Sequence, residues 1–192
     1  MTKKYTKKRT HTQAKDEEVS LGTRFISYLI DWYVGALCTA IPIALISQKL
    51  TNTMLNQNII EFEAPYGIIA GILAVMFAIF YFVIVPTYIT KGQTFGKKVC
   101  KLKIVQKSDE DITLKNMVLR QIVGIIIIEG VLVSASSVWH QIASIITEVN
   151  FVSPLMYVGF VITGISILLL VLTPKKRAIH DYLGNTKVIK NI

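Results

Sequence analysis

Four long apolar runs separated by polar stretches dominate the hydropathy pattern of this chain. They cover about residues 24–46, 66–89, 119–138 and 154–172. Each run is close to the roughly 20 residues that a helix needs to cross about 30 Å of hydrocarbon. The third run is the shortest, and Glu129 interrupts it. The pattern predicts an all-α membrane protein built as a bundle of four transmembrane helices.

A short alternating segment lies in the polar stretch between the second and third runs. Residues 97–106 read KKVCKLKIVQ, in which Leu102 and Ile104 fall on one side and Lys101 and Lys103 on the other. A period of two is typical of a strand. Residues 186–189 form a second strand candidate that can pair with the first. We therefore expect a small strand-containing cap at one end of the bundle.

Small residues form a stripe along the second run. Gly67, Ala70, Gly71, Ala74 and Ala78 recur at three- and four-residue spacing. Such a stripe lets another helix approach closely in a membrane. We interpret it as a packing face within the chain, and packing across a dimer is the alternative.

Composition agrees with a membrane protein. The 192 residues are 52% hydrophobic, with a mean hydropathy of +0.51, which is too apolar for an ordinary soluble domain of this size. The net charge of +9 raises the alternative of a nucleic-acid-binding protein. However, the basic residues flank the apolar runs instead of alternating with stacking aromatic side chains. The sequence therefore predicts no nucleic-acid partner.

The basic residues also indicate an orientation. Twenty of the 21 Lys and Arg residues lie in residues 1–24, 91–120 and 175–190, and only Lys49 lies elsewhere. The positive-inside rule then places both termini and the middle loop in the cytoplasm. We expect the basic surface to favour anionic lipids of the bilayer. Residues 1–20 are polar and basic and are predicted to be a disordered tail, followed by a membrane domain over residues 21–189.

Charged residues inside the apolar runs are the candidates for function. Arg24 and Asp31 lie seven residues apart, about 10 Å along a helix, so they need partners elsewhere in the chain. Arg120, at the start of the third run, is a second candidate partner for Asp31. Asp31 and Glu129 are either carboxylates that hold helices together or carriers on a pathway for protons or Na⁺.

Known catalytic and metal-binding patterns are missing from the sequence. It has no glycine-rich phosphate loop, no HExxH motif and no serine–histidine–acid order. Cys38 and Cys100 are far apart, and His11 and His140 fall on opposite sides of the membrane in the predicted topology. We therefore predict no metal site, no cofactor and no enzymatic activity.

Three separated segments resemble the RDD family of membrane proteins, which is named after one arginine and two aspartates. They are RFISYLIDWYV with Arg24 and Asp31, GQTFGKKVCKLKIV from Gly92, and IHDYLGNTKVI from Ile179, which contains Asp181. The resemblance extends over residues 21–189. This chain departs from the family at Cys100–Lys101, where leucine–glycine is frequent, and at Gly184–Asn185, where alanine–glycine is common.

The resemblance implies a multi-pass protein of the bacterial plasma membrane that transports an unidentified ligand. Cation/proton antiport has been suggested for some members. This leads to the hypothesis that Arg24 pairs with Asp181 as an inner gate, while the alternative is that Arg24 reaches the lipid headgroups as an anchor. A transporter would move Na⁺, K⁺, Li⁺ or protons and is expected to be a homo-oligomer. The other function class is a non-transporting scaffold or regulatory partner of another membrane protein.

Overall fold

The first apolar run forms one long helix, α1 (Leu21–Thr51). The computed structural model describes residues 19–191, so nearly all of the predicted tail lies outside the described residues. The 31 residues of α1 span about 46 Å, which exceeds the hydrocarbon thickness. Asn52 ends the helix in a left-handed conformation and donates its N–H to the carbonyl of Gln48. The helix therefore extends beyond the predicted range 24–46 at both ends.

The second run is helical throughout the predicted range 66–89. α2 (Tyr66–Ile79) continues into η2 (Phe80–Ile89), which has the wider turns of a π-helix. All five small residues of the predicted stripe are buried within the chain, where α2 packs against α1 and α5. A Cβ atom added to Gly71 would lie 2.7 Å from side-chain atoms of Ile59 and Ile142. The stripe therefore acts as an intramolecular packing face.

The third run is broken, which differs from the continuous helix predicted over 119–138. α4 (Leu114–Met117) and η3 (Val118–Glu129) form its first part, and α5 (Ser134–Thr147) follows at an angle of 62°. The cause is Gly130, whose left-handed φ of 65° ends η3 and whose N–H bonds the carbonyl of Ile125. The break places Glu129 at the end of a helical segment.

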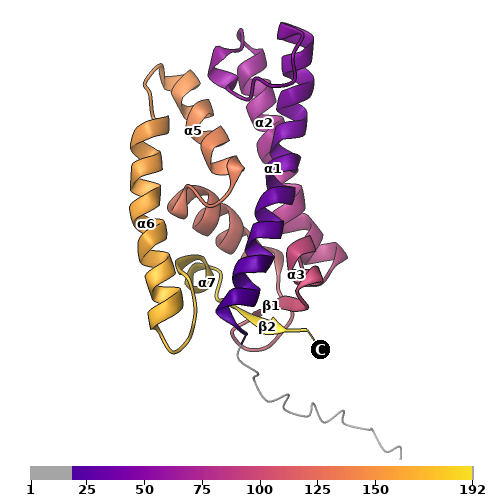
Figure 1. The fold of residues 1–192 in the computed structure, drawn as a ribbon, viewed down its shortest axis with the longest axis vertical. Helices are drawn as coiled ribbons and strands as arrows, with labels where there is room; N and C mark the ends of the chain where they lie inside the picture. Colours follow the sequence, from indigo (N-terminus) through magenta and orange to yellow (C-terminus); the bar gives the residue numbers. More distant parts are fainter. Residues whose placement is uncertain (1–18, 192) are drawn as a thin grey trace, which may run out of the picture.

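The fourth run forms α6 (Val152–Leu172), which is mostly exposed. In Figure 1, η3 and α5 lie between α6 and α1. Within residues 19–191, three helices are long and apolar enough to cross a membrane: α1, the α2–η2 pair and α6. The number rises to four if the bent pair of η3 and α5 is one span.

A small antiparallel sheet lies at the end of the bundle where α1 begins and α6 ends (Figure 1). β1 (Leu102–Gln106) pairs with β2 (Thr186–Lys190), with Ile104 opposite Val188. The predicted two-strand sheet is therefore confirmed. The first strand is shorter than expected because α3 (Phe95–Val99) forms over the start of the alternating segment.

Two residues in left-handed conformations precede the strands. Lys101 has a φ of 52° before β1, and Asn185 has a φ of 50° before β2. Both are positions at which the resembling family commonly carries glycine, the residue that adopts this conformation without steric cost. Lys101 and Asn185 therefore adopt the left-handed conformation although neither is glycine. Asn185 is followed by β2 and preceded by α7 (Ile179–Leu183), which docks on η3.

Candidate functional site

The carboxylate of Asp31 is enclosed by hydrogen-bond donors. Asp31 is 3% exposed, and its Oδ1 accepts bonds from the Tyr81 hydroxyl at 2.7 Å and the Gly96 N–H at 2.8 Å. Its Oδ2 accepts bonds from Thr94 Oγ1 at 2.5 Å and Lys97 Nζ at 3.0 Å. Each oxygen therefore has two donors, and one of the four donors carries a charge.

Three of these donors come from one short segment because that segment approaches α1 very closely. A Cβ atom on Gly96 would lie 2.9 Å from Cγ of Asp31 and would also collide with the carbonyl oxygen of Ser27. Only glycine fits there without displacing the segment. The sequence marked this segment by its alternating pattern and by its family resemblance, but neither feature indicated its contact with Asp31. Arg120, expected as a partner of Asp31, binds a different carboxylate.

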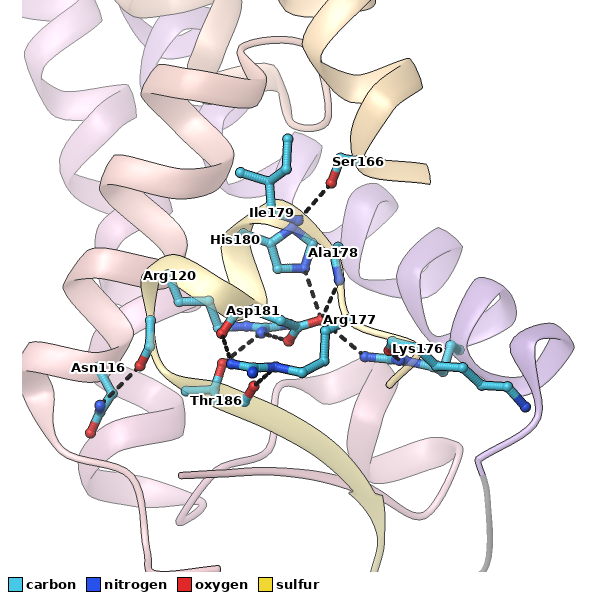
Figure 2. Close-up of polar contacts among 12 residues, drawn as sticks. Asn116, Arg120, Ser166, Lys176, Arg177, Ala178, Ile179, His180, Asp181 and Thr186 are labelled. Atoms are coloured by element: carbon cyan, nitrogen blue, oxygen red, sulfur yellow. Dashed lines mark hydrogen bonds and ion pairs between the residues drawn. The ribbon is translucent and has the colours of Figure 1, made fainter. Parts of the chain in front are cut away.

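Arg120 binds Asp181, a fully buried residue of α7 (Figure 2). Arg120 Nη1 donates to Oδ1 of Asp181, while Arg24 Nη2 lies 3.2 Å from Oδ2. The Ala178 N–H also donates to Oδ2, at 3.1 Å, and Arg177 Nη2 donates to the Asp181 carbonyl at 2.7 Å. The contact between Arg24 and Asp181 required by the pairing hypothesis is present. The Arg24 side chain is only 12% exposed, which is unlike a headgroup anchor.

These arginines connect the C-terminal segment to two helices. Arg24 Nη1 donates to the Lys176 carbonyl at 2.5 Å, and Arg120 Nη1 donates to Thr186 Oγ1 at 2.9 Å. Burial raises the pKa of the Asp181 carboxyl, but the positive charges of its neighbours, first Arg120, outweigh burial. The pKa of Asp181 therefore lies well below its usual range, and the carboxylate stays charged at physiological pH.

Glu129 has a different kind of partner. It is fully buried, and Nδ1 of His180 lies 3.0 Å from each of its carboxylate oxygens. Oε1 also accepts bonds from Ser166 Oγ at 2.7 Å and from the His180 N–H at 3.2 Å, while Thr163 Oγ1 bonds the Glu129 carbonyl. The position of Glu129 in an apolar run predicted a site there, but nothing in the sequence identified His180 as its partner.

The two acids proposed as ion carriers occupy separate centres. Asp31 is bound by residues of η2 and of the segment around α3, whereas Glu129 is bound by residues of α6 and α7. Within residues 19–191, no hydrogen-bond donor binds both carboxylates. The same part of the chain contains no group of three His, Cys, Asp or Glu side chains arranged to hold a metal ion.

A cleft of about 370 Å³ lies beside these centres. Its polar lining includes Arg24, Asp31, Arg120, His180 and Asp181. Its apolar lining comes mainly from α1 and α6. The cleft is therefore lined by both motif aspartates and by the basic residues that bind them. It also borders His180, which binds Glu129.

The comparison with known families agrees with this geometry. The RDD family matches residues 19–185, a range that contains Arg24, Asp31 and Asp181. Neither a curated protein nor a solved structure shows significant similarity to the chain. The match covers most of the chain, and the apolar helices are those of a multi-pass membrane protein. This chain therefore belongs to the RDD family.

Proposed function

We propose that this protein is a small proton-coupled transporter, a cation/proton antiporter, in which Glu129 and His180 carry the proton. The observation that supports this proposal is a buried glutamate at the end of η3, where a bent helix pair breaks, with a histidine as its side-chain partner. Ionisable residues inside membrane segments mark ion pathways, and histidine changes charge near neutral pH. Broken helices line the substrate sites of many transporters.

In this proposal the two aspartates have different roles from Glu129. The sequence-based hypothesis made Asp31 an ion carrier, but its oxygens already accept four protein donors. We therefore give Asp31 a positioning role and keep Glu129 on the proton pathway. Arg24 and Asp181 form the inner gate, since their ion pair joins α1 to the C-terminal segment beside the cleft. Opening the gate requires both charges to separate.

In the proposed topology the protein spans a bacterial plasma membrane and has both termini on the cytoplasmic side. The distribution of Lys and Arg supports this orientation, and four spans result when η3 and α5 are counted as one. Anionic lipids are the expected neighbours of the basic surface. Four helices without an internal repeat are few for alternating access, so the transporter is proposed to act as a homo-oligomer.

A second candidate is a non-transporting scaffold or regulatory partner of another membrane protein. Two observations favour it: the carboxylates of Asp31 and Asp181 are saturated by protein donors, and α6 exposes large apolar side chains such as Tyr157 and Phe160. In that case the buried charges serve only to hold the cap on the bundle.

Proton flux in proteoliposomes distinguishes the two candidates. Wild-type protein is reconstituted into vesicles that contain a pH-sensitive dye, and Na⁺, K⁺ or Li⁺ is added outside. We expect cation-dependent proton movement that is lost in Glu129→Gln, which keeps the size of the side chain and one acceptor oxygen but replaces the other oxygen with an NH2 group that cannot carry the proton. Asp111→Asn is the matched control, because the Asp111 side chain is 74% exposed and lies outside both centres. Folded wild-type protein that moves no protons with any of these cations would favour the scaffold.

A further inference from the structure

The cleft between α1 and α6 has the form of a site for an amphipathic molecule. Phe25 and Trp32 of α1 face it on one side, and Ile167 and Val171 of α6 line the other. Of the charged lining residues, Arg24 belongs to the first turn of α1 and Asp181 to α7, and α7 lies beside the small sheet at the end of the bundle where α6 ends (Figure 1). Its volume of about 370 Å³ falls in the usual range for ligand sites, roughly 300–1,000 Å³.

Two buried polar atoms in this lining have no hydrogen-bond partner. They are Oγ of Ser27, a residue 1% exposed, and Nε of Arg120, a residue 4% exposed. Buried polar atoms are nearly always bonded, and an unmet donor costs free energy. An arginine nitrogen can only donate, and a hydroxyl can donate as well. Both residues line the cleft, and a bound ligand with acceptor oxygens would satisfy these two donors.

The charge of the lining also favours an anion. Its Lys, Arg, Asp and Glu members are three cations and two carboxylates: Arg24, Lys97 and Arg120, with Asp31 and Asp181. Both carboxylates are already bound by protein donors, so one positive charge remains in excess. A cation would find no carboxylate oxygen without a donor here. A singly charged anion would neutralise the excess.

We propose that the cleft binds one anionic glycerophospholipid of the surrounding bilayer, with its phosphate at Ser27 and Arg120 and one acyl chain along α1 and α6. Ser27 lies three residues inside Arg24, about 4.5 Å along the helix, close to the helix ends where headgroups lie. The apolar walls continue from there toward Trp32. The inference depends on membrane insertion and not on proton transport.

Native mass spectrometry of the purified full chain in mixed micelles tests this inference. Phosphatidylglycerol is titrated against the zwitterionic phosphatidylcholine and against palmitate, which has one chain and no phosphate. We expect one phosphatidylglycerol per chain, bound about ten-fold more tightly than either competitor. Equal binding of phosphatidylcholine would overturn the assignment of an anion site, and equal binding of palmitate would overturn the assignment of a phospholipid.

Two matched pairs of variants locate the bound lipid. Ser27→Ala removes one unpartnered hydroxyl and should weaken phosphatidylglycerol binding about three- to ten-fold, whereas Ser136→Ala removes an unpartnered buried hydroxyl outside the cleft and should change nothing. Val171→Trp fills the cleft and should abolish binding. Val161→Trp places the same ring on an exposed part of α6 outside the cleft lining.

The outcomes of these variants are decisive because folding is measured in parallel by gel filtration and thermal melts. If Val171→Trp does not fold, the serine pair alone decides, since neither serine hydroxyl has a bond to lose in the structure. Equal lipid binding by Ser27→Ala and Ser136→Ala would overturn the proposal. A dimer whose formation excludes lipid and depends on Val171 would assign the cleft to a second copy of the chain instead.

Discussion

Adjacent residues of α7 bind two buried carboxylate centres in different ways. Asp181 is itself the carboxylate of the first centre, where two arginines from α1 and η3 bind it. His180 is the partner in the second centre, where its Nδ1 lies 3.0 Å from both carboxylate oxygens of Glu129. Arginine keeps its charge at every physiological pH, so fixed positive charges bind the carboxylate of the first centre. An imidazole, a hydroxyl and a backbone N–H bind the carboxylate of the second.

The different donors of the Asp181 and Glu129 centres suit these centres to different roles. In the closed state the Asp181 centre joins the C-terminal segment to α1 and η3, and its arginines keep their charge, so a pH change near neutrality does not open it. Within residues 19–191, the Glu129 centre has no arginine or lysine among its donors, which are His180 and Ser166. In the proposed transporter it is therefore the centre at which a proton is exchanged.

Asp181→Ala should be the most destabilising of these changes. It leaves Arg24 and Arg120 buried without their carboxylate, and removing one member of a buried ion pair typically costs about 3–5 kcal/mol. Chemical denaturation in micelles measures the free energy of unfolding. Asp111→Ala is the control, because its pair with Lys103 is largely exposed and should contribute less than about 1 kcal/mol. Similar losses in both variants would contradict a structural role for the Asp181 centre.

The Asp181 contribution should be constant at neutral pH and lost only in strong acid. Its pKa is lowered in the folded protein, so its contribution is complete above the unfolded pKa of about 3.9 and is lost as the pH falls through the folded value. The stability difference between wild type and Asp181→Asn should therefore not change from pH 8 to pH 5 and should shrink below pH 4. A difference that already shrinks between pH 7 and pH 5 would contradict the prediction.

Arg24 and Asp181 should show coupled effects on stability. Single variants Arg24→Ala and Asp181→Ala are compared with the double variant in the same denaturation assay. Because the two side chains are in direct contact, we expect a coupling free energy of about 1–3 kcal/mol. If the two losses simply add, the pair does not act as a unit, and the proposed gate has no energetic basis.

The Glu129 centre should give a smaller effect than the Asp181 centre. Its side-chain donors are the imidazole of His180 and the hydroxyl of Ser166, whereas two arginines bind Asp181. We therefore expect His180→Gln to cost about 1 kcal/mol, measured by chemical denaturation in micelles. His140→Gln serves as the control, since His140 is buried but is not a partner of Glu129. Equal losses in both variants would show that the effect does not come from the pair with Glu129.

Much of the architecture was predictable because it depends on local properties of the chain. Hydropathy located the apolar helices, three- and four-residue spacing identified the buried face of α2, and alternation located the two strands. These signals come from residues that are near one another in the sequence. The resemblance to the RDD family similarly identified Arg24, Asp31 and Asp181 before any contact was known.

The break in the third run was less visible. Gly130 follows a run of isoleucines and Glu129, and a single glycine in an apolar stretch is compatible with a continuous membrane helix. Whether the helix bends there depends on the partners available to the freed backbone. Here the Glu129 carbonyl is bound by Thr163, and the Ile126 carbonyl by the indole of Trp139.

The apolar runs, the charges inside them and the need of each charge for a partner could all be read from the amino-acid sequence. The identity of each partner depends on the folded chain. Asp31 binds Lys97 rather than Arg120, which binds Asp181 instead, 61 positions away. The reason is physical: burial of a charge demands a partner of opposite charge or several donors, but any suitable group satisfies that demand. The choice among them follows from which segments the folded chain brings together.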